Sequence, residues 1–256
     1  TPEQLTGRSA EHIVELSQPR CLLHAGIESG FLEMHRAARR AGIELVPASS
    51  FRSFERQLTI WNEKFDGIRP VLGADGEPVD VGALDEEARV RAILLWSALP
   101  GASRHHWGTD LDLIDRAALP EGYRVQLIGA EYGRGGIFER LHDWLLRHAE
   151  EFGFFKPYRG VLSAVAPEPW HWSHAQIAER ARAQLTPEIL LEALESAPVQ
   201  GLAVLRGELG ARAAASPSSM MPTVLMLTDG AVCSPAGATA IAAGPPSSSL
   251  WAESPA

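Results

Sequence analysis

The strongest constraint on this fold comes from two short segments, far apart in the chain, that are rich in His, Asp and Glu. They are Ser103–Asp112 (SRHHWGTDLD) and Glu168–Trp172 (EPWHW). Imidazoles and carboxylates are zinc ligands, and a catalytic zinc ion takes three protein ligands and keeps one open position. Two imidazoles, one ligand carboxylate and one spare carboxylate are the groups that metal-assisted hydrolysis uses. A shared site requires the chain to bring the two segments together.

Local geometry sets two conditions on such a site. In a straight strand His105 and Asp112 would face opposite ways, so the chain must bend between them. Gly108 is the residue that permits this bend. The second segment must turn near Pro169, because Glu168 and His171 are three residues apart and cannot share one face of a regular strand.

Each of these residues also has a purely structural interpretation. A His-His pair beside a Trp is usually a partly buried polar edge. Asp110 and Asp112 are compatible with a solvated strand face, and Trp170 and Trp172 are more often core than substrate platform. A His-rich edge without a metal is therefore one interpretation of the whole pattern.

The hydrophobic pattern predicts helices alternating with a few short strands. The first forty residues are predicted to be helical, most clearly 21–40, and further helices are predicted over 53–65, 85–96, 137–151, 173–184 and 186–195. Strands are predicted over 43–48, 108–114 and 169–173, with a loop or hairpin over 66–84. This pattern predicts an α+β fold in which a small antiparallel sheet carries the site and helices flank it.

Composition limits the size of the domain and the class of partner. The chain has 256 residues, of which 45% are hydrophobic, and this is enough for one domain with a sizeable core. The net charge of -9 argues against a nucleic-acid partner, and no apolar run is long enough to span a bilayer. Cys21 and Cys233 are too few for a disulfide framework.

A change in composition near Ala211 predicts the domain organisation. We assign 1–200 to the catalytic domain and 201–256 to an Ala/Pro/Ser-rich tail without stable structure, which could also be an out-of-frame end. No signal segment is visible at Thr1. A periplasmic or cell-envelope location is expected if such a segment preceded Thr1, and a cytoplasmic one otherwise. The sequence does not indicate an oligomeric state.

Three segments together resemble the VanY-type D-alanyl-D-alanine carboxypeptidases. Residues 103–112 are similar to that family's SxHxxGxAxD signature, and residues 168–171 to its ExWH signature. Residues 50–57 (SFRSFERQ) are similar to its S-G-[YF]-R-S-x-x-x-Q segment. The segments occur in the family's order, and the resemblance covers residues 10 to 195.

The resemblance implies a hedgehog/D-Ala-D-Ala peptidase-like fold with one Zn²⁺ ion. It makes His105, Asp112 and His171 the zinc ligands. It makes Glu168 the general base and Arg52 the group that stabilises the oxyanion.

The resemblance also places Gln57 and Ser103 on the terminal peptide of the substrate. Two positions depart from the family pattern: Asp110 stands where the family usually has Ala, and Ser50 stands where it has Gly. Asp110 is interpreted either as orienting a ligand imidazole or as a solvent-exposed residue. His106 is one place out of register and is not taken as a ligand.

The implied function is zinc-dependent hydrolysis of the terminal D-Ala of peptidoglycan stem peptides, or of other D-Ala-D-Ala-terminated peptides, by a metal-activated water. The alternatives are a D,D-dipeptidase, a peptidoglycan endopeptidase of the same fold, and a non-catalytic zinc-binding module. A purely structural zinc site needs neither Glu168 nor Arg52, so the presence of both residues argues against the last alternative.

Overall fold

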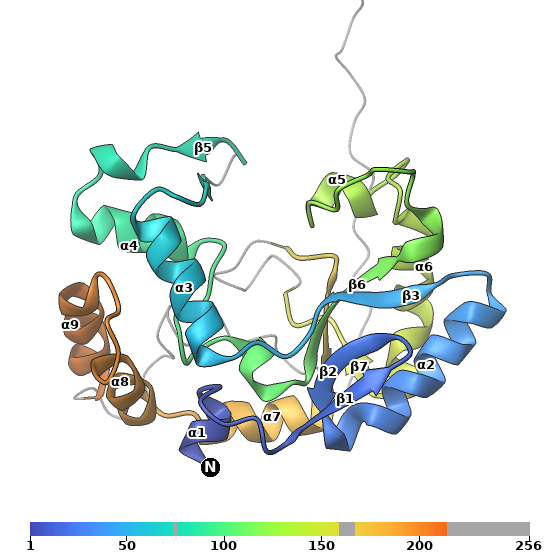
Figure 1. Ribbon diagram of the computed structural model, residues 1–256, viewed down its shortest axis with the longest axis horizontal. Coiled ribbons are helices and arrows are strands. Elements are labelled where there is room, and N and C mark those ends of the chain that lie inside the picture. Colours follow the sequence, from blue (N-terminus) through green and yellow to red (C-terminus); the bar gives the residue numbers. More distant parts are fainter. Residues whose placement is uncertain (74–75, 159–166, 214–256) are drawn as a thin grey trace, which may run out of the picture.

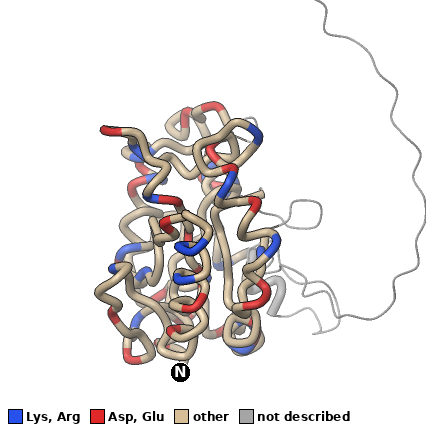
Figure 2. Tube along the Cα trace, turned by 90° about the vertical axis from the view of Figure 1, so that its right-hand side faces the viewer, with Lys and Arg blue, Asp and Glu red and all other residues tan. Residues whose placement is uncertain are grey.

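The computed structural model describes residues 1–73, 76–158 and 167–213. Figure 1 shows two groups of elements that face each other, one built on a sheet and one built of helices. Within the described residues, no helix combines the length and the hydropathy needed to cross a membrane. Figure 2 shows acidic and basic positions interspersed along this part of the chain.

A four-stranded antiparallel sheet, in the order β3-β6-β8-β7, forms the centre of the first group. Its strands are β3 (Leu45–Ser49), β6 (Asp110–Asp115), β8 (His171–His174) and β7 (Phe154–Phe155). Every residue of β6 is buried. Leu111 and Leu113 join the hydrophobic core, and the alternation of a strand turns Asp110 and Asp112 to the opposite face. This architecture confirms the predicted α+β class with a small antiparallel sheet flanked by helices.

Helices α2 (Glu28–Arg40) and α6 (Glu139–His148) pack against this sheet. Their apolar faces bury residues such as Phe31 and Leu141 in one core cluster with the strands. The remaining short elements are α1 (Pro2–Leu5), β1 (Ile13–Ser17), β2 (Arg20–His24), η1 (Ala25–Ile27), η3 (Arg104–Trp107), η4 (Arg116–Ala118), α5 (Gly129–Tyr132), η5 (Ala149–Phe152) and α7 (Ala175–Gln184).

The second group consists of α3 (Phe54–Phe65), α4 (Glu86–Leu94), α8 (Pro187–Glu195) and α9 (Leu202–Ala213). The hairpin of β4 (Val71–Leu72) and β5 (Pro78–Val79) follows α3, and η2 (Val81–Ala83) precedes α4. A separate core cluster holds these elements together. Ser53 and Thr186 accept hydrogen bonds from the first turns of α3 and α8, which fixes where these two helices begin.

The prediction that the first forty residues are helical is wrong for 13–24, where β1 and β2 form an antiparallel hairpin. The burial pattern gives the reason, because Cys21 and Leu23 are buried whereas Leu22 is 40% exposed. That alternation has the period of a strand, and only α2 has the predicted helical stripe. The other predicted helices and strands are confirmed, with ends shifted by a few residues.

The packed part of the chain continues beyond our predicted boundary at residue 200. Helix α9 lies in the predicted tail, and its Leu205 and Leu209 are buried in the same cluster as α3, α4 and α8. Residues 214–256, including Cys233, lie outside the described residues, as do 74–75 of the predicted 66–84 loop.

Gly108 joins η3 to β6 and provides the bend that the sequence required. It has a left-handed φ of 67°, and an added Cβ would lie 2.4 Å from Ile13 Cδ1 and 2.8 Å from His24 N. The left-handed conformation alone disfavours a side chain by about 1–2 kcal/mol. The close approach to the β1–β2 hairpin adds a second, steric cost at this position.

We therefore expect Gly108→Ala to lower the free energy of unfolding by at least about 3 kcal/mol, as measured by urea denaturation. Gly122 is the matched control, because its φ is 73° and an added Cβ would meet nothing within 4 Å. Gly122→Ala should lose only about 1–2 kcal/mol. Equal losses in the two variants would contradict the steric argument.

Candidate metal centre

The structure brings His105, Asp112 and His171 together. One ligand atom from each side chain lies within 4.8 Å of the other two, and all three residues are buried. Asp112 and His171 are direct partners in the β6–β8 ladder. His105 reaches them from η3 because the chain reverses its direction at Gly108.

The His105 ring is held by the backbone of the segment before α3. Its Nδ1 lies 2.9 Å from the carbonyl oxygen of Ser50, so Nδ1–H donates and Nε2 carries the free lone pair. Nε2 lies 3.4 Å from Asp112 Oδ2. The imidazole therefore presents an unprotonated nitrogen toward the Asp112 carboxylate.

The His171 ring is held from behind by Asp110. Its Nε2 lies 2.8 Å from Asp110 Oδ1, so Nε2–H donates and the Nδ1 lone pair faces the cluster. Asp110 is fully buried and also accepts hydrogen bonds from Arg104, Thr109 and Ser173. Of the two interpretations left open for Asp110, the structure excludes solvent exposure and supports the orienting role.

The same geometry leaves oxygen and nitrogen lone pairs facing one another. His171 Nδ1 lies 3.3 Å from both Asp112 Oδ1 and Glu168 Oε2. Asp112 Oδ1 is buried and accepts no hydrogen bond from the described residues. A buried carboxylate oxygen without a donor is unfavourable, and a divalent cation between these atoms removes the conflict. The two imidazoles and the aspartate thus fit a metal ion.

The charges around the cluster also favour a bound cation. Burial would lower the pKa of His171, but the hydrogen bond to Asp110 and the carboxylates of Asp112 and Glu168 beside the ring outweigh this and raise the pKa well above its ordinary value. Burial would raise the pKa of Asp112, but His105 and His171 outweigh it and hold that pKa below its ordinary value. The site therefore attracts positive charge at neutral pH.

Glu168 stands at the edge of the cluster. The backbone turns back after it, with His171 N–H donating to the Glu168 carbonyl oxygen at 3.2 Å, which is the turn that we predicted near Pro169. Its side chain is 15% exposed, in contrast to 4% for His171. The Glu168 carboxylate is thus accessible to water and adjacent to the cluster.

Arg52 and Gln57 form a connected pair beside the cluster. Arg52 Nη1 donates to Gln57 Oε1 at 2.9 Å, and Arg52 Nη2 donates to Ser49 Oγ at 3.0 Å. Gln57 Nε2 donates to the Ala98 carbonyl oxygen at 2.7 Å. Gln57 therefore fixes the direction of the guanidinium, in addition to lining the cavity with Ser103.

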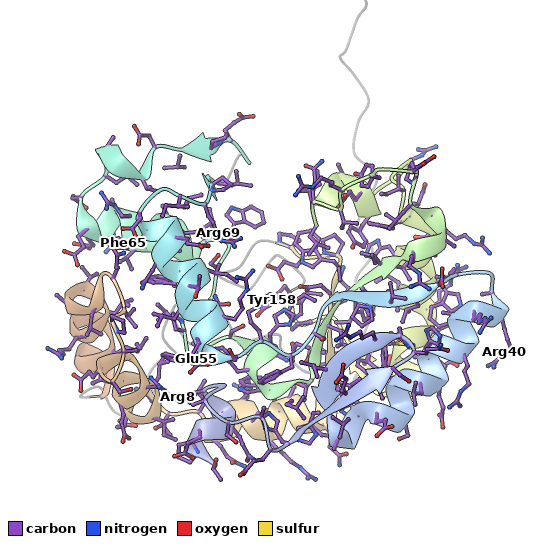
Figure 3. The ribbon with its side chains drawn as sticks, viewed as in Figure 1. Arg8, Arg40, Glu55, Phe65, Arg69 and Tyr158 are labelled. Atoms are coloured by element: carbon purple, nitrogen blue, oxygen red, sulfur yellow. The ribbon has the colours of Figure 1, made fainter. Side chains whose placement is uncertain are left out.

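These residues line one cavity of about 830 Å³ between the two groups of elements. Its walls also include residues that sequence reasoning did not identify, such as Lys64, Trp96 and Tyr158. Figure 3 shows Tyr158 between the two groups, and its ring lies edge-to-face with His171 at 4.9 Å. These residues belong to no metal-ligand pattern, so no motif pointed to them.

His106 belongs to the scaffold of the site. Its Nδ1 donates to the Arg52 carbonyl oxygen at 2.6 Å, and its Nε2 accepts from Gly101 N–H at 3.0 Å. Burial lowers the pKa of His106 to about 3, so the ring is neutral. With both ring nitrogens engaged in hydrogen bonds, His106 has no lone pair for a metal. This agrees with the expectation that His106 is not a ligand.

Removing the Asp112 carboxylate should abolish the increase in the free energy of unfolding that a bound metal provides. A cation at a hundred times its Kd stabilises a folded protein by about 2.7 kcal/mol, and we expect Asp112→Asn to lose this zinc-dependent increment. The measurement is urea unfolding with zinc and with EDTA. Asp115→Asn on the same strand is the control and should keep the increment, because within the described residues Asp115 accepts hydrogen bonds from backbone N–H groups alone. An increment retained in Asp112→Asn would contradict this site.

Asp110→Asn should weaken zinc binding by about 10–100-fold, because the His171 ring loses the anion that orients it. The Kd is measured by competition with a fluorescent chelator. Ser173→Ala serves as the control, since it removes one donor to Asp110 and leaves the carboxylate in place. An unchanged Kd in Asp110→Asn would show that the ring needs no such support.

Comparison with known proteins places this geometry in a family. Residues 20–177 match the VanY family, described as D-alanyl-D-alanine carboxypeptidase. An uncharacterized protein of Haemophilus influenzae is 44% identical over 102 residues, which are 39% of this chain and 70% of that protein. A D-alanyl-D-alanine carboxypeptidase of Enterococcus faecalis is 26% identical over 148 residues, which are 57% of this chain and 45% of that protein.

Solved structures with a similar chain path include VanYB in complex with D-Alanine-D-Alanine. It has a TM-score of 0.48 and 22% identity, covering 66% of this chain and 79% of that chain. A mutant of the vancomycin resistance D,D-pentapeptidase VanY in complex with Zn(II) has a TM-score of 0.46 and 24% identity. The match covers 68% of this chain and 85% of that chain. Since the family match spans more than half of the sequence and contains every residue of the cluster, the chain belongs to the VanY family of D-alanyl-D-alanine carboxypeptidases.

Proposed function

We propose that the protein is a zinc-dependent D-alanyl-D-alanine carboxypeptidase that hydrolyses the terminal D-Ala of peptidoglycan stem peptides. The observation that carries the proposal is the convergence of His105, Asp112 and His171 in one cavity with Glu168 and Arg52. Membership of the VanY family supports the class of substrate.

The ligands proposed for zinc are His105 through Nε2, His171 through Nδ1, and the Asp112 carboxylate. A mixed nitrogen and oxygen set of three protein ligands is typical of catalytic zinc sites. When bound, zinc supplies Lewis-acid chemistry that lowers the pKa of water from about 15.7 to about 7.

Glu168 acts as the general base and acid in this proposal. Its carboxylate takes a proton from the attacking water and returns it to the amine of the departing D-Ala. Its place at the accessible edge of the cluster supports the role, because Oε2 lies 3.3 Å from His171 Nδ1 while the side chain still reaches solvent.

Arg52 stabilises the negative charge that develops on the carbonyl oxygen. A guanidinium that is already held in place needs no reorganisation when this charge appears, and the bonds from Arg52 to Gln57 and Ser49 hold it. Gln57 and Ser103 bind the terminal peptide of the substrate, and Asp110 positions His171.

The geometry also bears on the alternative functions. A zinc module that only binds has no use for an accessible carboxylate and a fixed guanidinium in the same cavity. A D,D-dipeptidase and an endopeptidase share the chemistry and differ in the substrate that the cavity accepts. Mass spectrometry of the products from D-Ala-D-Ala, a stem pentapeptide and intact muropeptides separates the three, and we expect release of D-Ala from the pentapeptide.

Glu168→Gln should lower kcat on the pentapeptide by at least about 100-fold, because the proton acceptor is lost, while the zinc content stays near one ion per chain. Release of D-Ala gives the rate, and elemental analysis gives the metal content. Glu179→Gln, at a partly exposed carboxylate on α7 that pairs with Arg182, is the control and should keep its activity. Near-normal turnover in Glu168→Gln would contradict the role assigned to Glu168.

A further inference from the structure

Leu127 has a backbone conformation that leucine rarely adopts. Among the residues that the structure describes, it is the only one other than glycine with a left-handed φ, at 54°. This conformation brings the Cβ of an L-residue too close to the backbone, so it persists only where the surroundings enforce it. Leu127 also lines the cavity of the candidate metal centre. A disfavoured conformation in the wall of a binding cavity points to a functional role.

The group that enforces this conformation is the carboxylate of Glu131, on the first turn of α5. Its Oε1 accepts hydrogen bonds from Tyr123 Oη–H at 2.8 Å and from Gln126 N–H at 3.0 Å, and its Oε2 accepts one from Ile128 N–H at 3.2 Å. Glu131 is buried, and the two amides that it binds belong to the residues on either side of Leu127. Because one carboxylate fixes both neighbouring amides, the Leu127 backbone has little freedom to relax.

The side chain of Leu127 connects the core to the cavity. It packs against the hydrophobic core of the sheet group and also lines the cavity. Ile128 lines the cavity next to it and is 38% exposed. Leu72 and Trp96 line the same cavity from the helical group, where Trp96 Nε1–H donates to the Gly73 carbonyl oxygen at 3.1 Å. The cavity therefore offers apolar side chains on two walls.

These two walls lie away from the metal ligands. Figure 1 shows α5, which follows Ile128, and β5, which pairs with the strand of Leu72, at the upper ends of the two groups. Figure 3 shows Tyr158, whose ring contacts His171, below both of them in the same view. A carboxypeptidase substrate has a single residue after the scissile bond. The part of a peptide that reaches the two apolar walls therefore precedes that bond.

We propose that Glu131 is a positioning residue that holds Leu127 as an apolar contact for the residues before the scissile bond. This inference rests on the proposed carboxypeptidase function. Leu127 would favour peptides with apolar side chains at these positions and would take no part in bond cleavage. A change at either residue should therefore raise KM for such peptides and leave kcat and the zinc content unchanged.

The test uses acetyl-Leu-Leu-D-Ala-D-Ala and acetyl-Asn-Asn-D-Ala-D-Ala, whose variable side chains are similar in shape and differ in polarity. With the zinc-loaded, full-length protein, we expect a KM about ten-fold lower for the Leu peptide at a similar kcat, as measured by release of D-Ala. Leu127→Ala should reduce this preference to about two-fold or less. Leu127→Met, which keeps an apolar side chain of similar size, should retain it.

Glu131→Gln should also reduce the preference to about two-fold or less. A glutamine has only one acceptor oxygen, so one of the donors around it would face another donor. The Leu127→Ala/Glu131→Gln double variant should lose no more than Leu127→Ala, because the contact through which Glu131 acts is already absent.

Tyr123→Phe removes a single donor from the Glu131 carboxylate and should lower the preference to about three-fold to five-fold. This milder variant keeps the test valid if Glu131→Gln does not fold. Glu139→Gln is the matched control, because the Glu139 carboxylate accepts a hydrogen bond from Gly135 N–H after α5 and is not among the described residues that line the cavity. It should keep the ten-fold preference.

Equal KM values for the two peptides in the parent protein, or a preference that survives Leu127→Ala, would overturn the apolar contact. A preference that is unchanged in Glu131→Gln or Tyr123→Phe, or a double variant that loses more than Leu127→Ala, would overturn the positioning role. Release of D-Ala from both peptides would show in these cases that the proposed carboxypeptidase function stands. No release from either peptide would overturn that function itself.

Discussion

The pairing of β6 with β8 is the interaction on which the rest of the site depends. It places Asp112 opposite His171 and Asp110 opposite Ser173 in one antiparallel ladder, so two distant segments share one register. Because side chains alternate along a strand, a slip by one residue would turn both aspartates into the core. The leucines that alternate with them, Leu111 and Leu113, are fully buried in the core cluster and oppose such a slip.

The two aspartates of β6 have separate tasks that follow from their neighbours. Asp110 is surrounded by donors, and its ion pair with Arg104 compensates its burial. Asp112 faces two imidazoles and keeps one oxygen without a donor. The Asp110 carboxylate is thus neutralised by Arg104 within the fold, whereas the Asp112 carboxylate remains to attract a cation. His171 lies between them and connects the two environments through its two ring nitrogens.

Sequence reasoning predicted the parts of this site that depend on residue type and local geometry. The residue pattern pointed to the two segments, and the family resemblance assigned His105, Asp112 and His171 as the ligands. Strand geometry required the bends that occur at Gly108 and after Glu168. Sequence reasoning could not decide the role of Asp110, because that role depends on where the Arg104 guanidinium folds. The hairpin at 13–24 was missed because its apolar residues also fit a helical stripe. Helix α9 was missed because composition does not reveal that its leucines are buried by packing against other helices.

Anomalous diffraction at the zinc absorption edge, from crystals of the zinc-loaded protein, locates the ion independently of activity. We expect one strong peak at coordination distance, about 2.0–2.2 Å, from the nearest nitrogens of His105 and His171 and an oxygen of Asp112. The Asp110 carboxylate should remain hydrogen-bonded to His171 Nε2. Zinc bound elsewhere, or side chains that touch no common ion, would show that these three residues do not form the metal site.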